Sequence, residues 1–347
     1  MKESLNPDAV HSWLSTLWPK NQYQNVIAGI NDDDCAILDI AGSKLVITTD
    51  YLNANPISKQ LGIATNRDLG KLLVAANLSD LLGTGARPIA FLASIMMQKE
   101  SELEDFNELM LGIESELGKY NIPLVGGDTK LGPSNAFCGT AIGICNNPGN
   151  LFIKNHAEAG DKIWLSGEVG SVGAAVNGLS TKIMSSEWMD WAKNILVSPE
   201  LPYHKSINLS KLNLGKGGTD ISDGLGENLY DLCESSNVGA KIFADKIPIN
   251  PRVKELATIL DIPAWYFAFS IGGDFQFLVT TDVNVEKTLQ KLGFVEIGTI
   301  EKTTEMIIHD EAESYILPRL GHSDYKLKSF SQEVKNMVNT LKNTFNK

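Results

Sequence analysis

The residues best suited to chemistry lie in the segment 218–225, GTDISDGL, where Asp220 and Asp223 flank Ser222. Small or apolar residues surround these three side chains. Two carboxylates so close together repel each other, and burying either one without a partner is costly. Either both aspartates face water, therefore, or a positive group lies between them.

Four further segments place an aspartate at the end of an apolar run or beside glycine. They contain Asp34 in NDDD, Asp50 after KLVITT, Asp80 in NLSD and Asp128 in GGDT. Mg²⁺ takes oxygen ligands and is usually held by a few carboxylates together with substrate phosphates. If the fold brings several of these segments together, they can hold Mg²⁺ against a polyphosphate.

Neighbouring residues suit the same site. Gly127 would let backbone N–H groups approach a phosphate closely, and the hydroxyls of Thr49 and Ser222 can donate to phosphate or join a metal shell. A single aspartate of this kind is more often a turn residue or a helix cap, as we expect for Asp68. The recurrence of the pattern favours a metal and phosphate site, where positioning and charge neutralisation carry phosphoryl transfer.

Other catalytic and nucleotide-binding patterns are missing from the sequence. It has no GxxxxGK[ST], GxGxxG or GxSxG segment, and its five histidines are well separated. A net charge of −12 argues against nucleic acid or anionic membranes as partners. We expect a cytoplasmic protein, because no secretory signal or membrane span is evident and the four cysteines form no CxxC pair.

Hydrophobic periodicity predicts mixed strands and helices in two successive blocks, an α+β fold or an α/β fold with a mixed sheet. The polar segment CNNPGN predicts a boundary that divides the chain into residues 1–148 and 149–347. A long helix is expected from Asp68 to about Gly83, and a basic amphipathic helix from Lys326 onward. Strands are expected at CAILDI, KLVITTD, FLASIMM, IPLVGGD, AFCGTAIGIC, DKIWLSG, GAKIFAD, FQFLVTT and FVEIGTI.

The segments NDDDCAIL, VITTD, NLSDLLGTGARP, VGGDT, AGDKIWLSGEVG and DISDGL resemble thiamine-monophosphate kinases in order and approximate spacing. That family belongs to the superfamily of aminoimidazole ribonucleotide synthetase, and the resemblance covers the chain from about Ile30 to Ile300. It implies an N-terminal domain whose strands pair across a homodimer into a β-barrel. A C-terminal α/β domain would pack beside it, with ATP and several Mg²⁺ ions in the cleft.

The resemblance also implies roles for individual residues. Gly127, Asp128 and Ser222 would contact the nucleotide phosphates, and Asp128, Asp220 and Asp223 would act in catalysis. The doubled aspartate of GTDISDGL would then be neutralised by Mg²⁺ that bridges ATP. The implied metal ligands are Asp34, Thr48, Thr49, Asp50, Asp80, Asp128, Asp220 and Asp223.

The acceptor half of the site departs from the family pattern. Ile57 stands at about the place of a histidine that contacts thiamine phosphate in the family. GGDFQFL replaces GGEDYEL, whose glutamate touches substrate, so Asp274 and Gln276 are the nearest polar groups. Lys154 stands where an arginine commonly reaches the nucleotide, which retains the charge but loses the bidentate fork. Tyr325 is the aromatic residue that we expect near the substrate, and the segment 53–60 is expected to face it.

These observations predict an ATP- and Mg²⁺-dependent phosphotransferase of the thiamine-monophosphate kinase type, acting as a homodimer on a small-molecule phosphate acceptor. A phosphate monoester acceptor is already ionised at neutral pH, so no dedicated general base is expected. Two alternatives stay open. One is a ligase or cyclase related to aminoimidazole ribonucleotide synthetase, and the other is a nucleotide-binding protein without catalysis.

Overall fold

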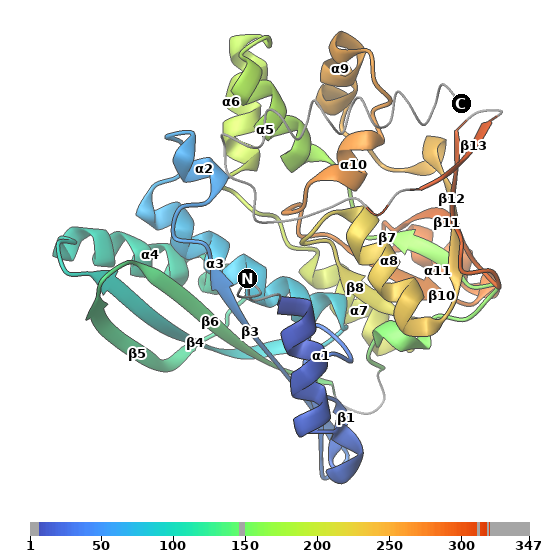
Figure 1. Ribbon diagram of the computed structural model, residues 1–347, viewed down its shortest axis with the longest axis horizontal. Helices are drawn as coiled ribbons and strands as arrows, with labels where there is room; N and C mark the ends of the chain where they lie inside the picture. The colour runs from blue at the N-terminus through green and yellow to red at the C-terminus, as the bar shows by residue number, and fades with distance from the viewer. Residues whose placement is uncertain (1–6, 146–149, 311–312, 318, 320–347) are drawn as a thin grey trace, which may run out of the picture.

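The computed structural model describes residues 7–145, 150–310, 313–317 and 319, which form two mixed sheets with helices packed on them (Figure 1). The predicted helix after Lys326, Tyr325 and most of the predicted boundary segment lie outside these ranges. None of the helices within them has the length and apolar content needed to cross a membrane. The predicted mixed α and β composition is confirmed.

The first sheet has six strands in the order β1-β2-β3-β6-β4-β5. Its neighbouring strands are antiparallel except β4 and β5, which run parallel because α4 connects them. The strands are β1 (Val26–Ala28), β2 (Ala36–Ile40), β3 (Ser43–Leu52), β4 (Arg87–Gln98), β5 (Leu124–Gly132) and β6 (Ala136–Cys145), preceded by α1 (Pro7–Leu17).

Two helices, α3 (Asn66–Gly83) and α4 (Leu103–Lys119), cover one face of this sheet. They approach so closely that a Cβ on Gly70 would lie 2.1 Å from the Leu109 carbonyl oxygen, so this crossing requires glycine. The prediction that Asp68 is the N-cap of the long helix was wrong. Thr65 is the N-cap, and Asp68, the third residue of the helix, closes a capping box because its side chain accepts from the Thr65 N–H.

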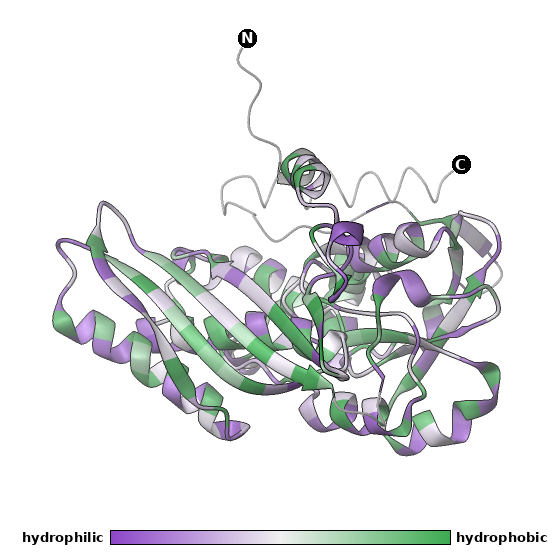
Figure 2. Cartoon of the chain, turned by 90° about the horizontal axis from the view of Figure 1, so that it is seen from below, coloured by the Kyte–Doolittle hydropathy of each residue, from purple (hydrophilic) through white to green (hydrophobic). Residues whose placement is uncertain are grey.

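The other face of the first sheet bears Thr49, Thr140 and Asp128, and we call it the outer face. The outer face carries Thr49 because Thr48, its neighbour on β3, points to α3, and successive strand residues point to opposite faces. In Figure 2 the strands of this sheet lie in view with no helix in front of them. Within the described chain the sheet is open, with β1 and β5 at its edges. The barrel expected across a dimer therefore stays a prediction.

The second sheet has seven strands in the order β13-β12-β9-β11-β7-β10-β8, antiparallel except for β12 and β9. Its strands are β7 (Lys162–Leu165), β8 (Gly218–Asp220), β9 (Gly239–Phe243), β10 (Phe277–Thr281), β11 (Val295–Glu301), β12 (Met306–Asp310) and β13 (Glu313–Ile316). The helices of this half are α5 (Ser171–Thr181), α6 (Ser186–Ile195), α7 (Tyr203–Leu212), α8 (Leu225–Ser236), α9 (Pro251–Leu260), α10 (Tyr266–Ser270) and α11 (Glu286–Lys291).

The C-terminal end of α3 joins the two halves. A Cβ on Gly83 would lie 2.5 Å from the Asp220 backbone nitrogen, so α3 rests directly on the backbone of β8. The carbonyl oxygen of Leu82 accepts from the Ser206 hydroxyl at 2.6 Å, and that of Thr84 accepts from the Phe152 N–H at 2.8 Å. The second half thus adds hydrogen bonds to carbonyl groups at the end of α3, of which Leu82 also accepts from the Gly85 N–H at 3.1 Å.

Candidate functional site

The site is built around Ser79 and Asp80, two successive residues of α3 that face different halves of the molecule. Successive helix residues differ by about 100° in direction, so one can face β3 while the other faces β8. Asp80 Oδ2 accepts from the Thr48 hydroxyl on β3 at 2.6 Å. Ser79 Oγ donates to Asp220 Oδ2 on β8 at 2.5 Å, and Ser222 Oγ donates to Asp220 Oδ1 at 3.2 Å. Because Ser79 holds Asp220 and Asp80 is the next residue of the helix, the carboxylates of Asp80 and Asp220 lie close enough to repel each other.

A buried lysine lies next to these carboxylates. Lys154 is only 7 % exposed, and its Nζ contacts Asp34 Oδ1 at 2.5 Å. Burial would lower the pKa of Lys154, but the charges of Asp34 and Asp33 and the hydrogen bond to Asp34 outweigh burial and raise it. The other Asp34 oxygen accepts from the Thr219 hydroxyl at 3.0 Å, and Asp33 accepts from the Lys154 N–H at 2.9 Å. Lys154 is thus an internal counter-cation of Asp34.

The carboxylates raise one another's pKa. Burial, followed by the charges of Asp50, Asp220 and Asp34, raises the pKa of Asp80 well above its ordinary value. Burial and the charges of Asp34 and Asp223 likewise raise the pKa of Asp50. Burial, with Asp34 as the largest charge, also raises the pKa of Asp220, and burial and Asp34 raise that of Asp33 to about 7. Repulsion of this strength favours binding of a cation.

The donor set suits Mg²⁺ by its chemistry. Apart from the Lys154 ammonium, the clustered groups are carboxylate or hydroxyl oxygens, which are the ligands of a hard cation. Each of Asp34, Asp80 and Asp220 is held by protein donors, however, and the described residues contain no group of three or more His, Cys, Asp or Glu placed to hold a metal ion. The residues therefore fit Mg²⁺ in type and charge, and their side chains must turn to bind it.

Two of the predicted ligands lie apart from this cluster. Thr49 Oγ1 bonds Thr140 Oγ1 at 2.9 Å on the outer face. Asp128 is on the same face, separated from β3 by β6 and β4, a distance of roughly 14 Å at the usual strand spacing. Its carboxylate pairs with Lys130, which lowers its pKa. Gly127 packs on β4, where a Cβ would lie 1.8 Å from the Ala93 carbonyl oxygen. The first sheet alone therefore does not bring Asp128 to Asp80.

A cavity of about 350 Å³ opens beside the cluster, between the two halves. Asp50, Ser222 and Asp223 line it, and so do Ile57 of α2 (Ile57–Gln60) and residues of α3, α5 and α6. Gly272 permits the contact between two of its walls, since a Cβ there would lie 1.7 Å from the Ser222 carbonyl oxygen. The volume is at the low end of the range for small-molecule sites.

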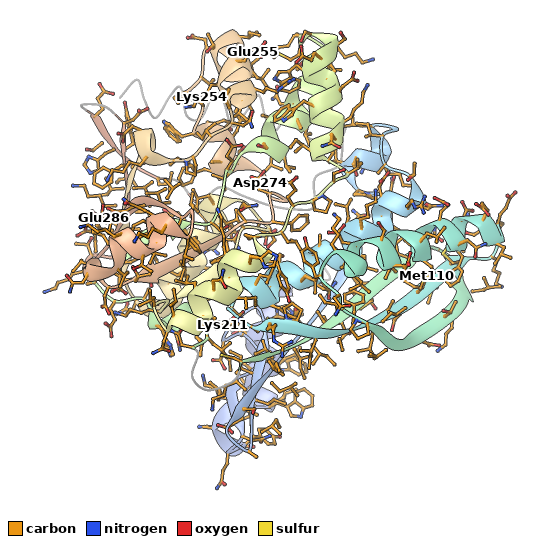
Figure 3. The ribbon with its side chains drawn as sticks, turned by 180° about the vertical axis from the view of Figure 1, so that it is seen from behind. Met110, Lys211, Lys254, Glu255, Asp274 and Glu286 are labelled. Atoms are coloured by element: carbon orange, nitrogen blue, oxygen red, sulfur yellow. The ribbon has the colours of Figure 1, made fainter. Side chains whose placement is uncertain are left out.

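The acidic residue expected near the substrate points elsewhere. Asp274 is half-buried, in the loop between α10 and β10 (Figure 3). Its carboxylate accepts from the Gly170 N–H at 2.6 Å and the Val172 N–H at 3.0 Å, at the start of α5. Burial outweighs these hydrogen bonds and raises the pKa of Asp274 to about 6. Gln276 accepts from the Ser166 hydroxyl and donates to the Glu200 carbonyl oxygen.

Several residues of the site carry no sequence pattern that singles them out. Ser79, Thr219 and Asp33 each hold a residue of the cluster, and Asn77 accepts from the Asp50 N–H at 3.0 Å. Their adjacency to Asp34, Asp80 and Asp220 in the sequence is the one available signal. Tyr325 lies outside the described residues.

Two family models match the chain. The model of the AIR synthase related protein N-terminal domain matches residues 32–145, and the model of the C-terminal domain matches residues 158–311. The first match spans the first sheet from β2 to β6, and the second spans β7 to β12.

Curated relatives are similar over most of the chain. Thiamine-monophosphate kinase of Methanocaldococcus jannaschii is 32 % identical, over 81 % of this chain and 88 % of its own length. The enzyme of that name from Pyrococcus horikoshii is 28 % identical, over 85 % of this chain and 90 % of its own. A putative hydrogenase expression/formation protein of M. jannaschii is 31 % identical, over 66 % of this chain and 67 % of its own.

Solved structures share the fold. Thiamine-monophosphate kinase from Stenotrophomonas maltophilia superposes with a TM-score of 0.69 at 25 % identity, over 87 % of this chain and 97 % of that one. AaThiL complexed with AMPPCP and TMP superposes with a TM-score of 0.73 at 21 % identity, over 90 % and 98 %. The chain belongs to the AIR synthase related proteins and, within them, to the thiamine-monophosphate kinase family of ATP-dependent kinases.

Proposed function

We propose that the protein transfers a phosphoryl group from ATP–Mg²⁺ to a small phosphate monoester seated in the cavity beside Asp50. The observation that carries this proposal is the contact between the two parts of the site. The carboxylates of Asp50 and Asp223 line a cavity whose other lining residues are mostly apolar. A donor phosphate at the carboxylates and an acceptor in the cavity would meet there.

The residues of the cluster have separable roles in this proposal. Asp34, Asp50, Asp80, Asp220 and Asp223, with Thr48, would hold Mg²⁺, which when bound neutralises the charge of the triphosphate. Ser222 would donate to a phosphate oxygen at the mouth of the cavity. The acceptor phosphate is ionised at neutral pH, so the protein positions it without removing a proton.

Lys154 and the outer face complete the proposal. Lys154 would reach the nucleotide only by leaving Asp34, so its first role is to balance that carboxylate. Gly127, Asp128 and Thr49 would contribute through a homodimer in which a partner covers the outer face. The division of the chain into 1–148 and 149–347 stays a prediction, and so does the role of Tyr325.

The test is formation of ADP from ATP–Mg²⁺ with and without thiamine monophosphate, the acceptor in the relatives' names, beside an Asp80→Asn variant. Formation of thiamine diphosphate by the wild type alone would support both the transfer and this acceptor. ATP binding that requires Mg²⁺ and Asp80, with no turnover on any phosphate monoester, would reject the transfer and favour a nucleotide-binding role. Absence of ATP–Mg²⁺ binding would reject the site.

A ligase-type activity is the second candidate, because the two family models that match the chain are those of AIR synthase related proteins. In such a reaction phosphate activates an amide or carbonyl oxygen and then leaves. Equimolar ADP and free phosphate, with no phosphorylated product, would favour this candidate over the kinase.

A further inference from the structure

Phe275 has an unusual backbone conformation at the wall of the cavity. Its φ of 50° lies in the left-handed region, where a bulky side chain is sterically unfavourable. Phe275 is half-buried and lines the cavity next to Gly273, whose φ of 99° is also positive. Backbone of this kind persists only where the surrounding structure enforces it, and it is often retained where it places a side chain for function.

The two neighbours of Phe275 in the chain hold this conformation. The carboxylate of Asp274 accepts from two backbone N–H groups at the start of α5, at 2.6 and 3.0 Å. The carbonyl oxygen of Gln276 accepts from the Ile221 N–H at 2.7 Å. Neither Asp274 nor Gln276 lines the cavity, so Phe275 is the side chain that this part of the loop presents to it.

The same loop contacts the segment that is expected to bind phosphate. A Cβ on Gly272 would lie 1.7 Å from the carbonyl oxygen of Ser222, so the two backbones are in contact. Ser222 and Asp223 line the cavity, as Phe275 does. An acceptor with its phosphate at these groups would therefore have its body beside the ring of Phe275.

Packing of the hydrophobic core does not account for Phe275. Phe277, two residues later, is 1 % exposed and belongs to the cluster that contains Phe152 and Trp164. Phe275 is in none of the three hydrophobic clusters that the described residues form. A large aromatic side chain in a strained conformation outside the core is better explained by a ligand that it contacts.

The charges at the cavity favour a cation at this ring. Asp50 and Asp223 are carboxylates, and none of the described lining residues is Lys, Arg or His. The face of an aromatic ring also attracts a cation, because the quadrupole of its π system makes that face negative. The carboxylates and the ring therefore act in the same direction on a positively charged acceptor.

We propose that Phe275 is a specificity-determining residue, and that the face of its ring stacks on a cationic ring of the acceptor. Phe275 lies in GGDFQFL, the segment in which this chain departs from the GGEDYEL of the family. An aromatic contact would bind the acceptor here because the polar side chains of Asp274 and Gln276 are bonded elsewhere. This inference rests on the proposed function and names a residue that selects its acceptor.

The test compares two acceptors on the full-length protein. Thiamine monophosphate carries a cationic thiazolium ring, and 3-deazathiamine monophosphate carries a neutral thiophene ring of the same shape. Binding of each is measured calorimetrically in the presence of Mg²⁺ and AMPPCP, and transfer is measured with ATP.

Three variants isolate the ring. Phe275→Leu removes the ring and keeps an apolar side chain at the same backbone position, and Phe275→Tyr keeps the ring. Phe243→Leu is the matched control, because it makes the same substitution at a half-buried phenylalanine of β9 that does not line the cavity.

Phe275→Leu should raise the Kd and the KM of thiamine monophosphate about tenfold, equivalent to 1.4 kcal/mol, because stacking and cation–π contacts have energies of this order. The KM of ATP and kcat should stay within about twofold of the wild type, since the acidic cluster is unchanged. The loss of affinity for the neutral acceptor should be about threefold or less, because no cation–π contact is lost. Phe275→Tyr and Phe243→Leu should bind both acceptors as the wild type does.

The readouts separate the inference from the proposed function. Unchanged affinity of Phe275→Leu for thiamine monophosphate, with transfer intact, would overturn the inference and leave the proposed function standing. Equal losses for the two acceptors would overturn the cation–π contact, and a parallel rise in the KM of ATP would show a structural role for Phe275 instead. Binding that follows the expected pattern without transfer would support the role of Phe275 and reject the kinase reaction on this acceptor. If the wild type does not bind thiamine monophosphate, the inference is overturned, and ADP formation with other phosphate monoesters decides the proposed function separately.

Discussion

Replacing Lys154 by Met removes the internal counter-cation of the acidic cluster while keeping most of the side-chain volume. Lys154 Nζ contacts Asp34 at 2.5 Å, and its charge also lowers the pKa of Asp33 and Asp220, whose burial raises it. Removal of one partner of a buried ion pair typically costs about 3–5 kcal/mol. Protonation of the remaining carboxylates can absorb part of this cost, so we expect destabilisation near the lower value, about 3 kcal/mol.

Thermal unfolding in EDTA and in MgCl₂ measures this effect. A loss of 3 kcal/mol corresponds to a decrease in Tm of about 4 °C for a chain of 347 residues that unfolds as one unit. Mg²⁺ should raise the Tm of the variant more than that of the wild type, because Asp34 no longer has a competing cation. An Mg²⁺ concentration about 100 times the Kd would return about 2.7 kcal/mol.

Two variants serve as controls. Lys154→Arg keeps the charge and should remain within about 1 kcal/mol of the wild type. Lys216→Met also removes a lysine with acidic partners, Glu158, Asp161 and Asp282, but at a site away from the cluster. Mg²⁺ should raise the Tm of Lys216→Met by no more than it raises the Tm of the wild type. A Lys154→Met protein as stable in EDTA as the wild type, or an equal Mg²⁺ response of both Met variants, would refute the reasoning.

Three further predictions concern the same region. Asp80→Asn removes the carboxylate that Asp50 and Asp220 repel, so the free energy of unfolding of the metal-free protein, measured in urea, should rise by about 1–2 kcal/mol. The same variant should lower kcat at least about 100-fold. A decrease in the free energy of unfolding would contradict this prediction. Gly83→Ala should lower the free energy of unfolding by about 2–3 kcal/mol, because its Cβ would lie 2.5 Å from the backbone of β8. Gly118→Ala on α4 is the control: its Cβ meets nothing within 4 Å, so the free energy of unfolding should stay the same or rise slightly. The third concerns Asp274, whose pKa is raised to about 6, so its contribution to stability is complete below about pH 4 and is lost as the pH rises through 6. The free energy of unfolding of the wild type minus that of Asp274→Asn should therefore fall by about 2 kcal/mol from pH 4 to pH 7, and a rise would mean that the amide donors of α5 outweigh burial.

The elements that carry the site can largely be predicted from the sequence, whereas their ends cannot. The apolar periodicity that includes Leu69 and Leu73 predicts α3 because those side chains must be buried against the first sheet. The start of α3 is ambiguous because Thr65 and Asp68 are both capping residue types, and the capping box uses both. Which one is the N-cap depends on the path of the preceding loop, and local sequence does not contain that information.

The candidate site divides in the same way. The sequence identifies the carboxylates because each follows an apolar run, yet it groups Thr48 with Thr49, which the strand directs to opposite faces. It also groups Asp128 with Asp50, although β6 and β4 lie between their strands, because strand order is a property of the whole sheet. The contact of Lys154 with Asp34 joins residues 120 positions apart, so no local pattern predicts it.

The C-terminal end of α3 has a consequence for how the chain unfolds. The carbonyl oxygen of Thr84 accepts from the Phe152 N–H, and that of Leu82 accepts from Ser206 as well as from Gly85, so the end of the central helix of the first half is bonded to the second. A fragment that ends before Phe152 would leave the Thr84 carbonyl oxygen without this partner and would expose the apolar surface around it. The two sheets are therefore not independent folding units, and we expect a single cooperative transition in which neither half persists after the other has melted.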